Sequence, residues 1–477
     1  MKIKFSSNIE QNIVPSVRDM VALFGCQLVD EGEYDLDLRL SYADGLVRAI
    51  VSRGAGYFNA VVAVEGQGEA PTGEITRCVK LAVIDGLKQV TRKQPDMPWG
   101  VLTGVRPGKL GHKLVENGLG YNMLAEHLAS HYLVPNKQGQ LLAYIVALQD
   151  KIAPVSEAGL YIGIPFCPTK CSYCSFPSGI IPKSEEEQEN FLKLIELDLV
   201  NVVQLLSMHR INVSSLYIGG GTPTSFTDKV FGHFMELVAK HAPNTIREFT
   251  VEAGRPDCFS KAKLQAMEAV GVNRVSVNPQ TFHDKTLQRI GRKHSVAEFY
   301  EAYAMARESK IPIINMDLII GLPGETEQDI AYSLECAAKL KPENLTVHTL
   351  TLKKDAALFQ KQDEVSLSAE AAARMVELGA QTAAELGMVP YYLYRQHYML
   401  GHLANVGYAM PGTESIYNIQ MMEERHTVLA VGPSSSSKRP LEDGHHLKRH
   451  AMPKNIAVYE KTLEEQFSKR ALLFKLY

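Results

Sequence analysis

The stretch from Gly159 to about residue 352 alternates short apolar runs with longer segments of helical periodicity. Parallel strands need long crossover connections, usually helices, so this alternation predicts a parallel sheet covered by helices. The runs that predict strands are 160–164, 215–218, 248–252, 274–277, 312–320 and 344–350. We therefore expect an α/β fold, a partial (β/α)6 barrel of the TIM type, with functional groups at the carboxyl ends of its strands.

Three of the seven cysteines, Cys167, Cys171 and Cys174, follow the first predicted strand with the spacing Cys-x3-Cys-x2-Cys. Four cysteines would occupy every iron of a cubic [4Fe-4S] cluster, so three leave one iron open. Structural zinc needs four closed ligands, and no nearby Cys or His supplies the fourth. The odd cysteine count and the absence of a signal peptide argue against a disulfide. The loop therefore predicts a [4Fe-4S] site.

Two further domains are expected on either side of the barrel. Residues 1–153 predict an N-terminal α+β domain, because 36–42 alternates apolar and polar residues before an Asp-Gly turn, and 74–87 has helical periodicity. The barrel is expected over 157–365. Residues 366–477 predict a mostly helical C-terminal domain that begins with a long helix over 368–386.

The net charge and the distribution of apolar residues argue against nucleic acid and membrane partners. Fifty basic and fifty-three acidic side chains leave a net charge of −3, which gives no footprint for nucleic acid or for an anionic membrane. The first residues lack the apolar core of a signal peptide, and the most apolar run, 311–322, is interrupted by Asn315 and Asp317. We expect a cytoplasmic protein with no nucleic acid partner and no integral membrane segment.

Two polar segments outside the predicted barrel leave alternatives open. The motif Gly-Val-Arg-Pro-Gly-Lys is not a phosphate-binding loop, because no Ser or Thr follows its lysine. It is either an ordinary Gly/Pro-rich loop, or Arg106 and Lys109 face a carboxylate substrate. The segment 391–398 is either an aromatic strand packed on the barrel or a surface for a flat tetrapyrrole, with Arg395 and His397 as cationic donors.

The cysteine loop, with an aromatic residue before its third Cys, resembles the radical S-adenosylmethionine (SAM) superfamily. The resemblance implies that the open iron binds the amino and carboxylate groups of SAM, and that reductive cleavage yields a 5′-deoxyadenosyl radical. The methionine amino group would be bound by the segment Gly219, Gly220, Gly221 and Thr222, and its carboxylate would pair with Arg292. The ribose hydroxyls would be bound by Gln280 and Asp317. Glu252 would also contact SAM. Tyr161 and Tyr173 would orient the ligand or simply pack in the core.

Further motifs resemble the oxygen-independent coproporphyrinogen III oxidases over residues 159 to about 330. They include Tyr-Ile-Gly-Ile-Pro-Phe-Cys, Ile-Gly-Arg-Lys-His and Asp-Leu-Ile-Ile-Gly-Leu-Pro-Gly-Glu-Thr. With Gly-Val-Arg-Pro-Gly-Lys-Leu and Cys-Ser-Tyr-Cys-Ser-Phe-Pro-Ser, the chain resembles the HemZ-type branch, the coproporphyrinogen dehydrogenases. The resemblance implies oxidative decarboxylation of two propionates of coproporphyrinogen III to vinyl groups, with an electron donor such as flavodoxin or ferredoxin.

The chain departs from that family at informative positions. Ser175-Phe176 stands where the decarboxylase has Gly-Cys, and Gly163 stands where a His is often found. Two other functions are therefore kept beside decarboxylation. One is a haem-binding chaperone of the related type, and the other is a radical SAM enzyme acting on another tetrapyrrole.

Overall fold

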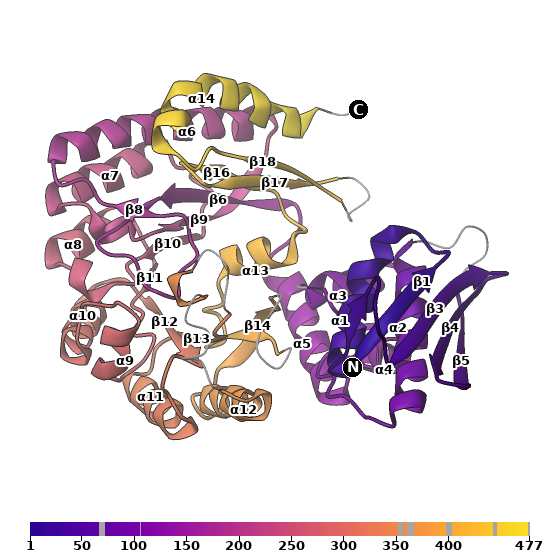
Figure 1. Cartoon of the computed structure of the whole chain (residues 1–477). Helices are drawn as coiled ribbons and strands as arrows, with labels where there is room; N and C mark the ends of the chain where they lie inside the picture. Colours follow the sequence, from indigo (N-terminus) through magenta and orange to yellow (C-terminus); the bar gives the residue numbers. More distant parts are fainter. Residues whose placement is uncertain are drawn as a thin grey trace. The chain divides into compact units, whose positions relative to one another are not determined.

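The computed structural model describes residues 1–65, 72–104, 106–351, 356–359, 367–396, 403–441 and 446–475 (Figure 1). The chain divides into two compact units. An N-terminal unit comprises Met1–Val105 and Leu114–Tyr144, and a barrel unit comprises Arg106–Lys113 and Ile145–Tyr477. The division thus differs from the single boundary expected at 153, because both Arg106–Lys113 and the chain from Ile145 onward belong to the barrel unit.

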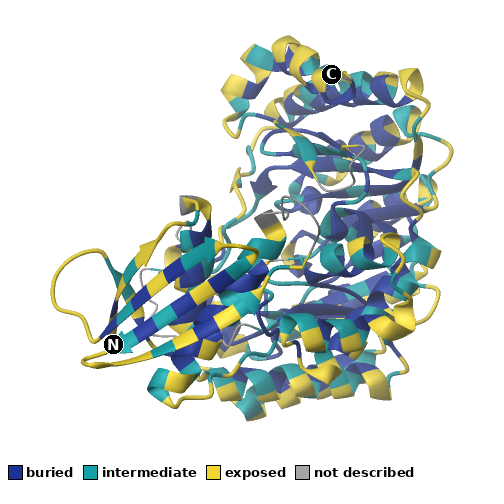
Figure 2. Cartoon of the chain, turned by 90° about the vertical axis from the view of Figure 1, so that its right-hand side faces the viewer, coloured by how far each residue is buried: buried dark blue, intermediate teal, exposed yellow. Residues whose placement is uncertain are grey.

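The N-terminal unit has the expected α+β fold. Its five-stranded sheet has the order β2-β1-β3-β4-β5. Leu36, Leu38 and Leu40 are at most 3% exposed, and Figure 2 shows this alternation of buried and exposed residues along the strands. Asp44 and Gly45 both have positive φ, as a two-residue hairpin turn requires. The strands are β1 (Lys2–Ser7), β2 (Gln27–Val29), β3 (Leu36–Ala43), β4 (Leu46–Arg53) and β5 (Gly56–Ala63), and the helices are α1 (Val14–Leu23), α2 (Thr72–Thr91) and α4 (Tyr121–Tyr132).

The six expected parallel strands form the centre of an eleven-stranded sheet in the barrel unit, which confirms the α/β fold of the partial-barrel type. Their order is β13-β12-β11-β10-β9-β6, and every adjacent pair is parallel. The alternating helices lie along the outer side of the sheet (Figure 1). The strands are β6 (Glu157–Ile164), β9 (Asn212–Gly220), β10 (Glu248–Glu252), β11 (Arg274–Ser276), β12 (Ile313–Ile320) and β13 (Asn344–Thr349), and the helices are α6 (Glu185–Met208), α7 (Asp228–His241), α8 (Lys261–Ala269), α9 (Asp284–Arg289), α10 (Val296–Glu308) and α11 (Glu327–Leu340).

Residues 366–477 do not form the separate, mostly helical domain that the sequence predicted. Their strands extend the barrel sheet at both edges, where unpaired backbone groups would otherwise be left open. β14 (Val389–Tyr394) and β15 (Asn405–Ala409) extend the β13 edge, and β16 (Val428–Val431) pairs in parallel with β6. The rest of this part comprises α12 (Ala369–Glu385), α13 (Ile416–Glu423), β17 (Ser436–Pro440), β18 (Leu447–Ala451) and α14 (Ile456–Ala471).

The later part of the Gly-Val-Arg-Pro-Gly-Lys segment is helical and is not the ordinary loop that one reading of the sequence predicted. Helix α3 (Pro107–Glu116) begins at its proline, a residue that suits the first turn because its missing N–H would have no helical partner. A Cβ on Gly108 would lie 2.1 Å from Oε2 of Glu423, so only glycine allows this approach. α5 (Asn136–Ile152) follows and leads to β6.

The longest helix, α6, has 24 residues and carries three glutamates in its first turn. Among the described residues, every helix is too short or too polar to cross a lipid bilayer.

Candidate functional site

A cavity of about 410 Å³ is lined by residues at and near the carboxyl ends of the central strands. Residues from all six β/α units and from β14 contribute to its wall. The structure therefore brings together side chains that are far apart in the sequence. The lining residues that the sequence singled out are Cys167, Cys171, Tyr173, Cys174, Gly220, Gly221, Thr222, Glu252, Gln280, Arg292 and Asp317.

All three loop cysteines line this cavity and none forms a disulfide. Oγ1 of Thr222 donates to Sγ of Cys167 at 3.5 Å, and Nη1 of Arg255 donates to Sγ of Cys171 at 3.7 Å. Burial raises the pKa of the Cys174 thiol, and a hydrogen bond from the Phe176 backbone opposes that rise. Hydrogen-bond donors aimed at cysteine sulfurs are the usual surroundings of thiolates that ligate iron–sulfur clusters.

Among the described side chains, no three of His, Cys, Asp or Glu gather closely enough to hold a single metal ion. A [4Fe-4S] cluster does not need such convergence, because each cysteine ligates a different iron. The loop's donor set, three soft thiols on one face of the cavity, therefore fits a cubic cluster and does not fit a structural zinc ion.

Glu252 ends β10 and presents a half-buried carboxylate to the cavity. The Tyr217 hydroxyl donates to Oε1, and the Gly220 backbone N–H donates to Oε2 at 3.2 Å. Burial raises the pKa of Glu252 to about 7. Among the described residues, no cationic side chain forms an ion pair with Glu252 that would offset the energetic cost of removing its charge from water. The site therefore suits a bound cationic group such as a sulfonium or an ammonium.

The glycine run packs closely against Glu252 and the cysteine loop. A Cβ on Gly219 would lie 2.7 Å from Oε2 of Glu252, and one on Gly221 would lie 2.4 Å from the Phe166 carbonyl oxygen. The backbone N–H of Thr222 donates to that carbonyl at 2.6 Å. The glycines are thus required for internal packing, and of the described cavity-lining residues only Gly220 and Gly221 come from this run.

Arg292 lines the cavity, is only 7% exposed and is held by several hydrogen bonds. Its Nη1 donates to the carbonyls of Gly254 at 2.9 Å and Asn278 at 3.1 Å, and its Nη2 donates to the Tyr173 hydroxyl at 3.2 Å. Its Nε has no hydrogen-bond partner. A fixed guanidinium with spare donor capacity fits a carboxylate ligand.

Asp317 is surrounded by amide donors. Nδ2 of Asn278 donates to Oδ2 at 2.8 Å, and Nδ2 of Asn315 donates to Oδ1 at 3.0 Å. Burial alone would raise the pKa of Asp317, but the nearby His348 and hydrogen bonds from Asn315 and Thr346 outweigh it, so the pKa lies below its ordinary value. Gln280 has a φ of +67°, a region that favours glycine, and its backbone N–H donates to the Asp317 carbonyl at 3.1 Å. The side-chain contacts favour an ionised Asp317, and the backbone hydrogen bond places Gln280 beside it.

The cavity wall also contains two tyrosines of the segment 391–398 and one histidine, His348, that the sequence did not single out. The rings of Tyr392 and Tyr394, on β14, lie 6.3 Å apart and are nearly parallel, with an interplanar angle of 2°. Nδ1 of His348 lies 3.1 Å from the Tyr394 hydroxyl, and its Nε2 lies 3.8 Å from Oδ1 of Asp317. The only sequence signal for His348 is its position near the end of the sixth central strand.

The first part of the segment 391–398 belongs to strand β14, as the aromatic-strand reading expects. Tyr391 and Tyr392 are buried in one core cluster, and Tyr392 and Tyr394 line the cavity, so a tetrapyrrole surface stays a prediction. Arg395 directly follows β14 and is not among the described lining residues. His397 lies outside the described residues.

Several other predicted site residues lie elsewhere. Tyr161 stacks on Tyr217 and Tyr417 at centroid distances of 6.2 and 5.9 Å, so packing describes it better than ligand contact. Arg106 forms an ion pair with Glu424 at 3.2 Å. Within the described part of the chain, Tyr161, Gly219, Arg106 and Lys109 are not among the residues that line the cavity.

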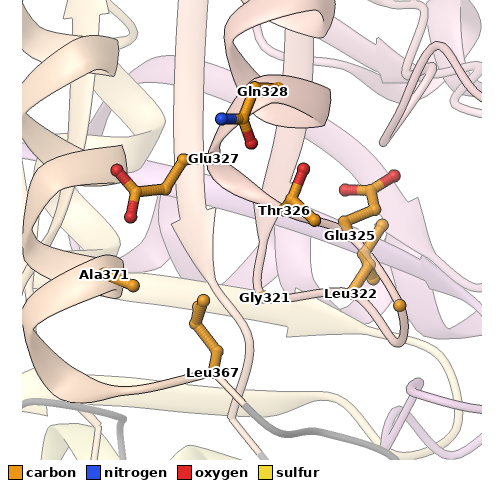
Figure 3. Close-up of a pocket in the computed structure, with 9 residues that line it drawn as sticks. Gly321, Leu322, Glu325, Thr326, Glu327, Gln328, Leu367 and Ala371 are labelled. Atoms are coloured by element: carbon orange, nitrogen blue, oxygen red, sulfur yellow. The ribbon is translucent and has the colours of Figure 1, made fainter.

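The loop after β12 lines a second cavity of about 380 Å³ (Figure 3). Gly321, Leu322 and the residues from Gly324 to Gln328 form one side, and Leu367 and Ala371 form the other. Glu327, the first residue of α11, accepts hydrogen bonds from Arg374 of α12 at 2.5 and 2.9 Å, so the start of α11 is tied to α12. The Asp-Leu-Ile-Ile-Gly-Leu-Pro-Gly-Glu-Thr motif is therefore divided, with Asp317 in the large cavity and its glycine-rich end outside it.

Comparison with known proteins places these features in context. Residues 161–337 match the model of the Radical SAM superfamily. The oxygen-independent coproporphyrinogen-III oxidase-like protein HemZ of Bacillus subtilis is 40% identical over 374 residues, which are 77% of this chain and 75% of that protein. The heme chaperone HemW of Bacillus subtilis is 33% identical over 195 residues, which are 40% of this chain and 50% of that protein.

A solved structure has the same fold. The Escherichia coli coproporphyrinogen III oxidase HemN, described as a radical SAM enzyme, aligns with a TM-score of 0.51 at 22% identity. The alignment covers 68% of this chain and 73% of that chain.

Proposed function

The chain belongs to the radical SAM superfamily and, within it, to the family of the HemZ-type coproporphyrinogen-III oxidase-like proteins. From this premise we propose that it oxidatively decarboxylates two propionates of coproporphyrinogen III to vinyl groups. Its cofactors are a [4Fe-4S] cluster and SAM, as in the rest of the superfamily. The product would be protoporphyrinogen IX, and a donor such as flavodoxin or ferredoxin would supply electrons.

The observation that carries this proposal is the aromatic wall in the same cavity as the cysteine loop. Tyr394 is half-buried, Tyr392 beside it is only 3% exposed, their rings are nearly parallel, and both residues line the cavity with Cys167 and Cys174. Aromatic faces pack well against a flat macrocycle. The wall and the loop would thus bring a tetrapyrrole and the cofactors into one cavity.

The chain's own residues have distinct tasks in this scheme. Cys167, Cys171 and Cys174 would hold the cluster. The chemistry that a bound cluster and SAM supply is one-electron cleavage of the sulfonium, which creates a radical able to abstract hydrogen.

Two side chains, opposite in charge when Glu252 is ionised, would hold SAM itself. The Glu252 carboxylate would attract its cationic end, and the Arg292 guanidinium would bind its methionine carboxylate. Asp317 and Gln280, which lie side by side through the backbone hydrogen bond between them, would accept and donate hydrogen bonds at the ribose hydroxyls. The opposite charges of Glu252 and Arg292 would fix the direction of the ligand in the cavity.

An anaerobic assay tests the proposal. Cluster-reconstituted protein is incubated with dithionite, SAM and coproporphyrinogen III, and 5′-deoxyadenosine, carbon dioxide and tetrapyrroles are measured together. We expect substrate-dependent release of both small molecules with formation of protoporphyrinogen IX. SAM cleavage that leaves the tetrapyrrole unchanged would contradict the proposal.

A matched pair of variants tests the aromatic wall. Tyr394→Phe keeps the ring and loses only the hydroxyl beside His348, whereas Tyr394→Leu removes the flat face. We expect KM for coproporphyrinogen to rise more in Tyr394→Leu than in Tyr394→Phe, with SAM affinity unchanged in both.

Haem delivery is the second candidate function, and the similarity to the HemW heme chaperone favours it. Ser175-Phe176 after the third cysteine also separates the chain from the decarboxylase pattern. Stoichiometric retention of haem by the purified protein, without tetrapyrrole turnover, would favour this function over decarboxylation.

A further inference from the structure

Arg255 makes a contact with the cysteine loop that no role described above requires. It follows β10, lines the cavity and is only 4% exposed. Its Nη1 donates to the Thr169 carbonyl at 3.2 Å and to Sγ of Cys171 at 3.7 Å. A charged donor therefore faces one of the three cysteine sulfurs.

Asp257 fixes the orientation of this guanidinium. Nε of Arg255 donates to Oδ1 of Asp257 at 3.0 Å, and Nη2 donates to Oδ2 at 2.7 Å. Such a two-bond contact between planar groups gives directional specificity as well as energy. Nη1, the nitrogen left outside this contact, is consequently the one that points at Cys171.

The donors to the other two sulfurs are neutral. Cys167 accepts from the Thr222 hydroxyl, and Cys174 is contacted by the Phe176 backbone. Hydrogen bonds to the cysteine sulfurs and the net charge around a cluster are two of the factors that set its reduction potential. Because Arg255 adds both a hydrogen bond and a full positive charge, its effect on a bound cluster should exceed that of either neutral donor.

The sign of each contribution follows from electrostatics. Three thiolates make a bound [4Fe-4S] centre anionic, and reduction by one electron adds a further negative charge. A nearby guanidinium stabilises the reduced state more than the oxidised state and raises the potential, whereas a nearby carboxylate lowers it. Asp257 is therefore expected to orient Arg255 and at the same time to offset part of its charge.

We propose that the Arg255–Asp257 pair tunes the reduction potential of the cluster through Cys171, with Arg255 raising the potential and Asp257 lowering it. The electron comes from a low-potential one-electron donor, and the cluster is the group that is reduced. The pair thus controls how readily such a donor can start SAM cleavage. This inference rests on the cluster and is independent of which substrate the enzyme uses.

An EPR-monitored redox titration tests the pair. The reconstituted holoprotein and its Arg255→Gln and Asp257→Asn variants are poised anaerobically with dithionite and mediators, and their iron content is measured. We expect a lower midpoint potential for Arg255→Gln and a higher one for Asp257→Asn, both with full iron content. A purely structural pair would move both potentials in the same direction or move neither, and either result would overturn the proposal.

Two more variants keep the test decisive. Arg255→Lys retains the charge and loses the two-bond contact, so its midpoint should lie between those of the wild type and Arg255→Gln. Thr222→Val removes a neutral donor to Cys167 and should lower the potential less than Arg255→Gln does. If Arg255→Gln fails to hold iron, unchanged potentials in Asp257→Asn and Arg255→Lys would still overturn the proposal.

Discussion

The backbone amide of Gly220 donates a hydrogen bond to Oε2 of Glu252 at 3.2 Å, which ties the glycine run after β9 to the carboxylate at the end of β10. The Tyr217 hydroxyl contacts the other oxygen. Burial nevertheless raises the pKa of Glu252 to about 7, because these neutral donors do not replace the lost hydration of a full charge. The carboxylate is therefore poised to ionise when a cation binds beside it.

The affinity for SAM should depend on pH through Glu252. With a pKa of about 7, about nine-tenths of the carboxylate is ionised at pH 8 and about one-tenth at pH 6, so binding of the cationic ligand should weaken about tenfold over that range. Isothermal titration calorimetry of the reconstituted protein measures this. Glu252→Gln cannot ionise and should bind weakly at both pH values. A wild-type pH profile identical to that of the variant would show that Glu252 does not act on SAM.

Arg292→Ala should weaken SAM binding while the cluster stays intact. Loss of a hydrogen-bonded charge pair costs on the order of 2 kcal/mol, or about 30-fold in affinity. Arg292→Lys keeps the charge but cannot reproduce the contacts to Gly254, Asn278 and Tyr173 together, so an intermediate affinity is expected. Calorimetry gives the affinity, and visible absorbance gives the cluster content. Wild-type affinity in Arg292→Ala would remove this residue from the SAM site.

Cys171→Ala should abolish bound iron and the visible absorbance of the reconstituted protein, because a cluster held by two cysteines leaves two irons without a protein ligand. Cys336→Ala is the matched control, since Cys336 is also buried but lies on α11 and is not among the described residues lining the cavity. Its iron content should equal that of the wild type. Equal iron content in both variants would contradict the cluster assignment.

Arg470→Leu should destabilise the protein by about 3–5 kcal/mol, the cost of leaving a buried charge unpaired. Nη2 of Arg470 lies 2.5 Å from Oδ1 of Asp198, and both side chains are 0% exposed. Urea unfolding followed by circular dichroism measures the loss. Lys469→Ala breaks an exposed pair with Glu465 and should cost less than about 0.5 kcal/mol. Similar losses in the two variants would show that burial does not govern the Arg470 pair.

Much of the site was predictable because its signals are local. Each central strand is a short apolar run followed by a helix, and the carboxyl ends of parallel strands meet at one edge of a sheet. The cysteines, Glu252 and Asp317 could therefore be assigned to one site from their positions after or near the ends of these runs. Arg292 was less obvious, since it lies between two helices, α9 and α10, and the family motif was the signal for it.

Contacts between distant segments were not predictable in this way. The four-residue strand β16 carries no pattern that indicates its parallel pairing with β6, and no local signal indicates the register shift between Pro390 and Tyr392 in the pairing of β14 with β15. The sequence around Arg106 does not indicate its ion-pair partner, Glu424, because the two residues are far apart in the chain and meet only in the folded structure.

The sequence by itself determined the barrel strands, the cluster loop and the family, because periodicity, spacing and motifs are properties of neighbouring residues. Only the tertiary structure decided which charges are already neutralised within the protein and which still face the cavity. Arg106 is paired with Glu424, whereas Glu252, with a pKa raised to about 7, faces the cavity without an ion-pair partner among the described residues. Burial and pairing of a charge depend on segments that meet only when the chain folds, so they cannot be inferred from the local sequence.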